Sequence, residues 1–325
     1  MSTALPIAPD TPWLAPLAGY SDLPFRLLCR EYGCSVAVTE MISAKGLIYN
    51  SPGTEELLQT CPQDTPLVVQ LFGAEESFLL RSMELLQHRG FKYFDLNCGC
   101  SVRKVVKTGS GAALLKDPAA LTRLARTLSA QAGPGCMGFK IRLGWDQQHT
   151  VYMPLAQDLE QAGAAWITLH PRWATQGFTG MADWSHLEHL KHAVQIPVIA
   201  SGDLFTATDA LRCIERTGVD SIMFARGALS DPSIFARYHA LYRNETPPLP
   251  SFSAVCALVR RLEFLYTTHA MPRAGLLKMR TLVPRLLKGW PGVKTIRRES
   301  VYCRSWAEML ALLERHPETS NPDEV

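Results

Sequence analysis

The sequence lacks the marks of several protein classes. No apolar run reaches the roughly 20 residues that span a bilayer, and Met1 to Trp13 lacks the basic-then-apolar pattern of a secretory signal. The nine cysteines include no Cys-x-x-Cys pair, so neither a disulfide framework nor a zinc ribbon is indicated. No solenoid-length repeat or low-complexity tract is present. We therefore expect a soluble protein of the reducing cytoplasm.

Two common ligand signatures are also missing. A Rossmann-type dinucleotide site requires Gly-x-Gly-x-x-Gly after the first strand, whereas the first expected turn reads Ala15-Pro16-Leu17-Ala18-Gly19. His186, His189 and His192 are three residues apart on an expected helix, but they point away from the expected core. We expect no dinucleotide site of that type and no metal site.

The chain does contain enough apolar residues for a large core. Its 325 residues are 47% hydrophobic and 19% charged, which fits one (βα)8 domain with an appendage, or two domains. Short apolar runs recur with helical stretches between them, as expected for parallel strands buried on both faces. The eight runs are Trp13–Pro16, Val36–Thr39, Leu67–Gln70, Tyr93–Leu96, Met137–Lys140, Trp166–Leu169, Pro197–Ala200 and Ser221–Phe224. Eight such units predict an α/β fold, a (βα)8 TIM barrel.

Polar residues gather at the carboxyl ends of these runs. They are Gln70, Asn97, Cys100, Lys140, Arg142, His170, Arg172, Ser201, Asp203 and Arg226. In a barrel these ends converge on one mouth, where the active sites of this fold lie. Strands that merely end where polarity begins would explain one or two such residues. They would not explain Lys140, His170 and Arg226 together with a cysteine.

A proline-rich segment separates the expected barrel from the rest of the chain. The sequence Thr246-Pro247-Pro248-Leu249-Pro250 predicts a linker, and the spacing of Ser253–His269 and Glu308–Glu314 is helical. We therefore expect a TIM-barrel domain over residues 1–242, a linker over 243–250 and a small helical domain over 251–325.

The expected helical domain is strongly basic. Between Arg260 and Arg298, ten lysines and arginines accompany a single acidic residue, Glu263. This density suits a polyanionic partner. A solvated helical face that binds nothing in particular is the alternative.

The loops after the last two expected strands suit a phosphate group. Ser201-Gly202-Asp203 and Ala225-Arg226-Gly227 combine glycines, which let the backbone approach an anion, with an arginine. A substrate phosphate and a cofactor phosphate would satisfy these loops equally. Lys140 and Gln70 favour a flavin, because a lysine stabilises the charge of a reduced flavin ring and a glutamine amide can bond its pyrimidine edge. For Gln70 alone, a cap on the backbone is the alternative.

Seven motifs occur in a specific order. They are Ala15-Pro16-Leu17-Ala18-Gly19-Tyr20-Ser21-Asp22-Leu23-Pro24-Phe25-Arg26, Thr39-Glu40-Met41, Val69-Gln70-Leu71-Phe72-Gly73, Asp95-Leu96-Asn97-Cys98-Gly99-Cys100, Lys104-Val105-Val106-Lys107, Lys140-Ile141-Arg142 and Arg226-Gly227-Ala228-Leu229. From about Trp13 to Tyr238 this order resembles the tRNA-dihydrouridine synthases, in particular their bacterial B-type members. The Leu276–Arg298 stretch is similar to their helical tRNA-binding domain. The chain departs from the family's usual residues at Ser101, Ser201 and Ala225.

The resemblance implies a role for each matching residue. Cys100 matches the catalytic cysteine of the family, and Asn97, Arg142 and Arg172 match positions around the target uridine. The implied FMN-binding residues are Pro16, Leu17, Ala18, Gln70, Lys140, His170, Ser201, Gly202, Asp203, Ala225 and Arg226. The expected tRNA-binding residues are Lys278, Arg280, Arg285, Lys288, Lys294, Arg297 and Arg298.

The implied reaction is the flavin-dependent reduction of the C5–C6 bond of a specific uridine in tRNA. NADPH would reduce FMN, the flavin would give a hydride to C6, and Cys100 would protonate C5. Residues two apart on an extended strand point the same way, so only the resemblance selects Cys100 over Cys98. An FMN barrel acting on a small pyrimidine, as dihydroorotate dehydrogenases do, and a non-catalytic tRNA-binding barrel are the alternatives. No protein partner is implied, and we expect a monomer.

Overall fold

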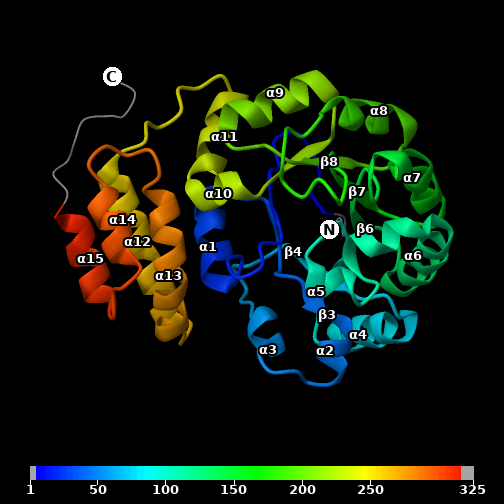
Figure 1. The fold of residues 1–325 in the computed structure, drawn as a ribbon, viewed down its shortest axis with the longest axis horizontal. Coiled ribbons are helices and arrows are strands. Elements are labelled where there is room, and N and C mark those ends of the chain that lie inside the picture. Colours follow the sequence, from blue (N-terminus) through cyan, green and yellow to red (C-terminus); the bar gives the residue numbers. More distant parts are fainter. Residues whose placement is uncertain (1–4, 316–325) are drawn as a thin grey trace.

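The chain forms a closed parallel barrel with a helical bundle beside it (Figure 1). The computed structural model describes residues 5–315, so residues 1–4 and 316–325 of the expected domains lie outside the described range. The strands are β1 (Trp13–Leu14), β2 (Val36–Val38), β3 (Ile42–Ser43), β4 (Leu67–Phe72), β5 (Tyr93–Cys98), β6 (Met137–Arg142), β7 (Trp166–His170), β8 (Val198–Ser201) and β9 (Ser221–Phe224). All pair in parallel, and the β1–β9 and β2–β4 pairings close the barrel. The predicted TIM barrel is confirmed.

Strand β3 is an addition that the apolar runs did not predict. The Thr39–Met41 segment leaves the ladder after β2, and the chain rejoins it where Ile42 pairs with Leu71 at the end of β4. This detour turns Glu40 toward the loop after β1. Its Oε2 accepts a hydrogen bond of 2.5 Å from the Gly19 backbone N–H.

Helices alternate with the strands and surround the barrel (Figure 1). They are α1 (Leu23–Glu31), α2 (Ala44–Ile48), α3 (Thr54–Leu57), α4 (Glu76–His88), α5 (Arg103–Val106), α6 (Pro118–Ala132), α7 (Tyr152–Gln161), α8 (Ser185–Ala193), α9 (Ala207–Thr217), α10 (Arg226–Ser230) and α11 (Ile234–Tyr242), with the 3-10 helices η1 (Gly111–Lys116) and η2 (Gln147–His149). Local sequence sets several boundaries. A capping box of Thr206 and Asp209 starts α9, and Gly218, in a left-handed conformation, ends it.

Two tryptophans fill the lower half of the barrel. Trp13 and Trp166 come from the first residues of β1 and β7, and their ring centroids lie 5.7 Å apart. Gly138 on β6 makes room for them, because a Cβ there would lie 2.0 Å from the Trp166 ring. Since both indoles lie at the amino ends of their strands, they fill the barrel at that end.

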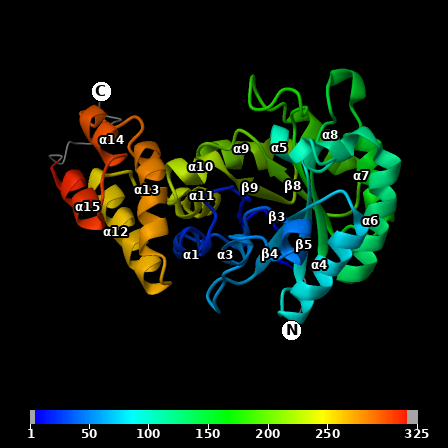
Figure 2. The same cartoon turned by 60° about the horizontal axis from the view of Figure 1, so that its bottom comes forward.

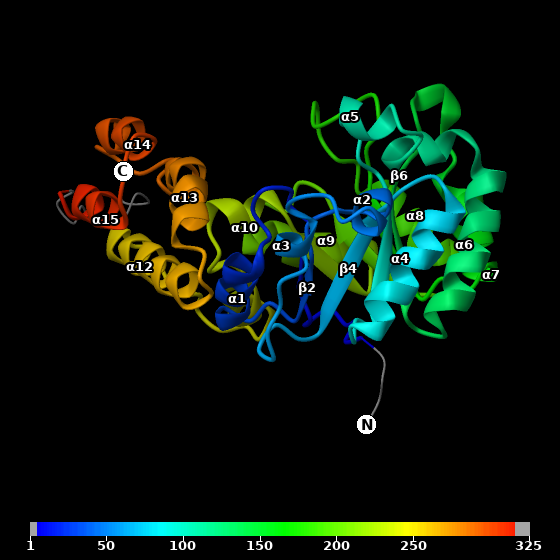
Figure 3. The same cartoon turned by 90° about the horizontal axis from the view of Figure 1, so that it is seen from below.

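The remaining helices form a bundle beside the barrel. They are α12 (Phe252–Thr268), α13 (Pro272–Leu286), α14 (Lys294–Ser300) and α15 (Trp306–Glu314). The connecting residues 245–250 belong to no helix or strand. Helix α12 packs against α1 and α13 against α10, as Figure 2 shows from the side. In Figure 3, α13 and α14 rise on the same side of the molecule as α5, which follows β5. The bundle therefore flanks the carboxyl ends of the strands.

Across residues 5–315, no helix combines the length and the apolar character that crossing a membrane requires.

Candidate active site

A cavity of about 440 Å³ opens at the carboxyl ends of the strands. Its wall includes thirteen of the fifteen residues expected for catalysis, cofactor or uridine: Pro16, Leu17, Ala18, Asn97, Cys100, Lys140, Arg142, His170, Ser201, Gly202, Asp203, Ala225 and Arg226. Gln70 and Arg172 are the two expected residues that do not line it. Residues from six strand ends thus meet in one cavity, because the carboxyl ends of barrel strands converge on one mouth.

Strand alternation explains why polar and apolar residues share the same strands. On β5, Phe94, Leu96 and Cys98 pack into the apolar layer beneath the helices. The intervening Asp95 and Asn97 instead make their hydrogen bonds inside the barrel.

The structure separates the two cysteines that sequence spacing leaves equivalent. Cys98 is the last residue of β5 and is fully buried in the outer apolar layer. Burial, followed by the charge of Asp95, raises the pKa of its thiol well above the usual value. Cys100 lies beyond the strand, where the chain has turned, and lines the cavity. Only Cys100 can therefore reach a ligand there.

The turn that carries Cys100 is held by Asn97. The Asn97 Oδ1 accepts hydrogen bonds from the backbone N–H groups of Gly99 (3.2 Å) and Cys100 (2.9 Å). The Cys100 carbonyl accepts a bond of 2.9 Å from the Ala112 N–H. Gly111 precedes Ala112 with a positive φ of 62°, and a Cβ there would lie 2.6 Å from the Cys100 carbonyl oxygen, so both the backbone conformation and the space favour glycine. The Cys100 backbone is fixed from both sides.

Lys140 has a buried anionic neighbour, Asp95 on the adjacent strand β5. Burial lowers the pKa of the Lys140 ammonium, and the Asp95 charge opposes this fall. Burial raises the pKa of the Asp95 carboxyl, which a hydrogen bond from Gln70 and the Lys140 charge oppose. Lys140 Nζ also lies 3.4 Å from the Ser201 hydroxyl. The ammonium thus faces the cavity with a counter-charge behind it.

Gln70 lies behind the cavity wall and bonds to side chains on both sides. Its Nε2 donates to Asp95 Oδ2 at 2.7 Å, and its Oε1 accepts from Asn97 Nδ2 at 2.8 Å. The sequence left open whether Gln70 meets a ligand or caps backbone. The structure shows the amide nitrogen and the amide oxygen of Gln70 each hydrogen-bonded to a side chain of β5.

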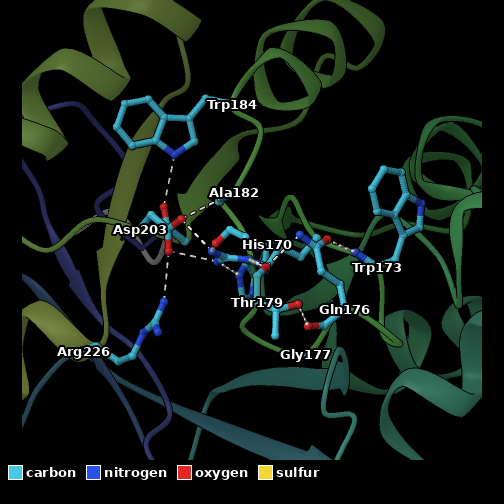
Figure 4. A network of polar contacts seen from close by, with 12 residues as sticks. His170, Trp173, Gln176, Gly177, Thr179, Ala182, Trp184, Asp203 and Arg226 are labelled. Atoms are coloured by element: carbon cyan, nitrogen blue, oxygen red, sulfur yellow. Dashed lines mark hydrogen bonds and ion pairs between the residues drawn. The ribbon is translucent and has the colours of Figure 1, made fainter.

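The loop after β8 forms another part of the cavity wall. Gly202 has a φ of 124°, and a Cβ there would lie 2.8 Å from His170 Cδ2, so a larger residue does not fit. Asp203 accepts hydrogen bonds from Arg226 (2.9 Å) and from the Ala182 N–H (2.7 Å), as Figure 4 shows. Burial raises the pKa of Asp203, but the bonds from Arg172 and Ala182 outweigh it and hold the pKa below its usual value. Asp203 therefore orients Arg226 at the cavity edge.

Arg172 lies behind the cavity wall and holds the loop that contains Thr179 and Gly180. It is 1% exposed and forms a bidentate pair with Asp203, at 2.9 and 2.7 Å. It also donates to the carbonyls of Thr179 and Gly180. Its Nη1 lies 3.1 Å from His170 Nε2, which must accept because a guanidinium only donates. His170 therefore carries its proton on Nδ1.

His170 is neutral in this setting. Burial lowers its pKa well below the usual value, and the charges of Arg142, Lys140, Arg172 and Arg226 lower it further. A neutral imidazole adds no positive charge to these four.

Six of the seven expected tRNA-binding residues divide into three groups. Lys288, Lys294 and Arg298 have exposed side chains on the bundle. Arg280 and Arg297 donate to backbone carbonyls within the bundle. Arg285 lines the cavity and lies 5.4 Å from the Tyr20 ring centre.

Lys278 makes contacts different from those of the other six. Its Nζ donates to Asp22 Oδ2 (2.7 Å) and to Glu40 Oε1 (3.3 Å), two barrel carboxylates that are 7% exposed. The hydroxyl of Tyr266 on α12 donates to the same Asp22 oxygen at 2.9 Å. Lys278 thus joins the bundle to the barrel.

The structure adds wall residues that the sequence did not single out. Phe178, Tyr20 and Met41 line the cavity, and the Phe178 ring lies under the guanidinium groups of Arg142 and Arg226 at 5.5 and 4.9 Å. Phe178 belongs to a loop that shows no periodic pattern, so sequence spacing carried no signal for it. No group of three or more metal-ligating side chains is found in residues 5–315.

Comparison with known proteins decides the family. Residues 13–320 match the family model described as dihydrouridine synthase. The chain belongs to the dihydrouridine synthase family. A Synechocystis protein named "Probable tRNA-dihydrouridine synthase 1" is 32% identical over 305 residues, covering 93% of this chain and 84% of that protein. The tRNA-dihydrouridine synthase B of Xanthomonas axonopodis pv. citri is 32% identical over 262 residues, covering 80% and 79%. The family expected from the ordered motifs is confirmed.

Solved structures share the barrel of this dihydrouridine synthase family member. A 2-naphthoyl-CoA reductase complex aligns with a TM-score of 0.54 at 10% identity, over 72% of this chain and 50% of that one. A morphinone reductase variant aligns with a TM-score of 0.51 at 10% identity, over 70% and 86%. At such low identity these structures bear on the fold alone.

Proposed function

We propose that this chain reduces the C5–C6 bond of a uridine in tRNA to give dihydrouridine, with FMN as cofactor and NADPH as electron donor. Family membership supports the reaction. The observation that carries it is the cavity where a cation, a thiol and a glycine-containing loop face one space. The small-pyrimidine alternative does not account for the bundle residue Arg285 in the same wall, and a non-catalytic tRNA-binding barrel does not account for Cys100 and Lys140 facing the cavity.

The residues present fit a flavin mononucleotide. A volume of about 440 Å³ lies in the range of small-molecule sites, about 300–1,000 Å³. Pro16, Leu17 and Ala18 give an apolar side for a planar ring. Gly202 admits close backbone approach, and Arg226 supplies a forked cation at the far end, where a phosphate would bind.

When bound, reduced FMN would supply the hydride for C6 of the uridine. Lys140 presents a positive charge to the cavity, which stabilises negative charge that develops on a ligand there. His170, neutral and protonated on Nδ1, occupies the wall without adding a charge. These groups favour a ligand that becomes more negative when it is reduced.

Cys100 would hold the proton for C5 on its Sγ. Its backbone is fixed by Asn97 and Ala112, while its side chain lines the cavity. A thiol can donate its proton to a carbon atom, which suits a general acid. Hydride addition at C6 and proton addition at C5 together saturate the double bond and balance the reaction.

We assign residues 1–242 to catalysis, 243–250 to a linker and 251–325 to tRNA binding. The exposed cations Lys288, Lys294 and Arg298 suit phosphate contacts, which contribute affinity without sequence information. A uridine must leave its stack to enter the cavity, which costs a few kcal/mol that binding elsewhere can supply. Arg285, in the cavity wall and on the bundle, lies where these two parts of the substrate would meet.

The test is dihydrouridine formation by the purified chain. Unmodified tRNA transcripts are incubated with the chain, FMN and NADPH, and nucleosides are quantified by mass spectrometry. We expect dihydrouridine with the native chain and with Cys98→Ala, and a rate at least about a hundredfold lower with Cys100→Ala, as for loss of a general acid. Loss of product with Cys98→Ala but not with Cys100→Ala would contradict the assignment.

A further inference from the structure

Asp95 belongs to the polar network beneath the cavity, and the proposed reaction gives it no direct role. Its side chain is buried, it lies on β5 two residues before Asn97, and it does not line the cavity. Burying a carboxylate destabilises the folded state unless the group has hydrogen-bonding or charged partners. Its partners therefore indicate what it does.

Asp95 begins a chain of hydrogen bonds that ends at the Cys100 backbone. Its Oδ2 accepts from Gln70 Nε2 at 2.7 Å, and Gln70 Oε1 accepts from Asn97 Nδ2 at 2.8 Å. Asn97 Oδ1 then accepts from the N–H groups of Gly99 and Cys100 at 3.2 and 2.9 Å. Three strand side chains thus connect a buried charge to the turn that carries the thiol.

The direction of every hydrogen bond in this series is determined at its Cys100 end. Backbone N–H groups only donate, so Oδ1 of Asn97 must face Gly99 and Cys100, and its Nδ2 must face Gln70. Gln70 must then present Oε1 to Asn97 and Nε2 to Asp95. The series is consistent only if residue 95 offers an acceptor.

The other neighbour of Asp95 is the cavity-facing Lys140. The two groups interact through their charges across the β5–β6 pair, in which Asn97 is in register with Lys140. One carboxylate therefore interacts with the cation proposed to face the flavin and, through hydrogen bonds, with the turn that holds the proposed acid.

We infer that Asp95 is a positioning residue, which acts through Gln70 and Asn97 to hold the Gly99–Cys100 turn so that the thiol faces the cavity. The importance of this turn for catalysis rests on the proposed function. The hydrogen-bonded acceptor at residue 95, rather than its charge, is what the turn requires.

Four substitutions separate these contributions. Asp95→Leu removes both the acceptor and the charge, whereas Asp95→Asn retains an acceptor oxygen and removes only the charge. Gln70→Met breaks the next link and leaves Asp95 beside Lys140. Asp220→Asn is the matched control, since it removes a carboxylate charge just before β9, at the opposite end of the barrel.

The measurement is amide hydrogen exchange at Gly99 and Cys100 in the chain without flavin or tRNA. Loss of one hydrogen bond predicts exchange at least about fivefold faster in Asp95→Leu and in Gln70→Met. Asp95→Asn and Asp220→Asn should stay within about twofold of the native chain. In turnover with tRNA, Asp95→Leu and Gln70→Met should lower kcat with little change in KM.

Two results would overturn the inference. Exchange at Gly99 and Cys100 that is unchanged in folded Asp95→Leu and Gln70→Met would show that the network does not hold the turn. Equal acceleration in Asp95→Asn and Asp95→Leu would show that charge, not the acceptor, matters. If Asp95→Leu does not fold, Gln70→Met alone decides. A native chain that makes no dihydrouridine would refute the proposed function but not the exchange result, which needs no substrate.

Discussion

Lys278 offers a prediction that separates bundle packing from tRNA binding. The Lys278→Met variant keeps a long, unbranched side chain and removes its charge. In the native chain this ammonium bonds Asp22 and Glu40 at 2.7 and 3.3 Å. The variant would leave these two carboxylates, each 7% exposed, next to each other without their cation. Glu40 also bonds the Gly19 N–H in the loop that lines the cavity.

The magnitude follows from the burial of the partners. Removing one member of a fully buried ion pair costs about 3–5 kcal/mol, because the other member keeps its desolvated charge. The Lys278 side chain is 24% exposed, so water offsets part of this loss. We expect the free energy of unfolding to fall by about 2–3 kcal/mol, at or below the lower limit of that range.

Urea unfolding measures this loss, and tRNA affinity at low temperature measures binding by the folded chain. Lys294→Met is the matched control, since this exposed lysine should change stability by less than about 0.5 kcal/mol and lower tRNA affinity instead. A Lys278→Met variant with native stability and weakened tRNA binding would refute the reasoning, because its ammonium would then serve phosphates rather than carboxylates.

Three further outcomes are expected. The unfolded chain protonates His170 below pH about 6.5 and the folded chain does not, so the free energy of unfolding should fall as pH drops through this value, by at most about 1.4 kcal/mol per pH unit. Urea unfolding of His170→Asn at several pH values should lack this contribution to the pH dependence. An equal pH dependence in both chains would contradict the lowered pKa. Gly202→Ala should lower the free energy of unfolding by about 1–3 kcal/mol and weaken flavin binding in a fluorescence titration. The control Gly90→Ala, also at positive φ but with open space around it, should keep the native flavin affinity. Equal flavin affinity in both variants would contradict a role of the Gly202 loop in flavin binding. Arg285→Gln should reduce the log–log salt slope of tRNA binding by about 0.7–0.9, and an unchanged slope would exclude a phosphate contact there.

The barrel could be predicted from the sequence because its signal is local. Each of its strands is a short apolar run, and parallel strands covered by helices must be apolar on both faces. The polar residues at the ends of these runs then had to meet at one mouth. Strand β3 was missed because Ile42–Ser43 does not form an apolar run, and its pairing depends on the path of Thr39–Met41.

The choice between Cys98 and Cys100 needed the tertiary structure. Along a straight strand the two would share a face, but β5 ends at Cys98 and the chain then turns. Where the strand ends depends on its pairing with β6, which reaches Cys98 opposite Ile141. The buried Cys98 and the cavity-facing Cys100 therefore follow from long-range pairing rather than from spacing.

The basic bundle also combines features that the sequence predicts with contacts that only the tertiary structure shows. Sequence alone established the density of lysines and arginines, and helical spacing places Lys278 and Arg285, seven residues apart, on one face of α13. It could not show that Asp22 and Glu40 meet Lys278 while Arg285 meets the cavity. Those partners lie more than two hundred residues away in sequence, and only the packing of α12 on α1 and α13 on α10 brings them together. The sequence by itself determined the barrel, its polar mouth and the basic tail, because these depend on local pattern. Tertiary structure decided which thiol and which cations face the cavity, because that depends on contacts between distant segments.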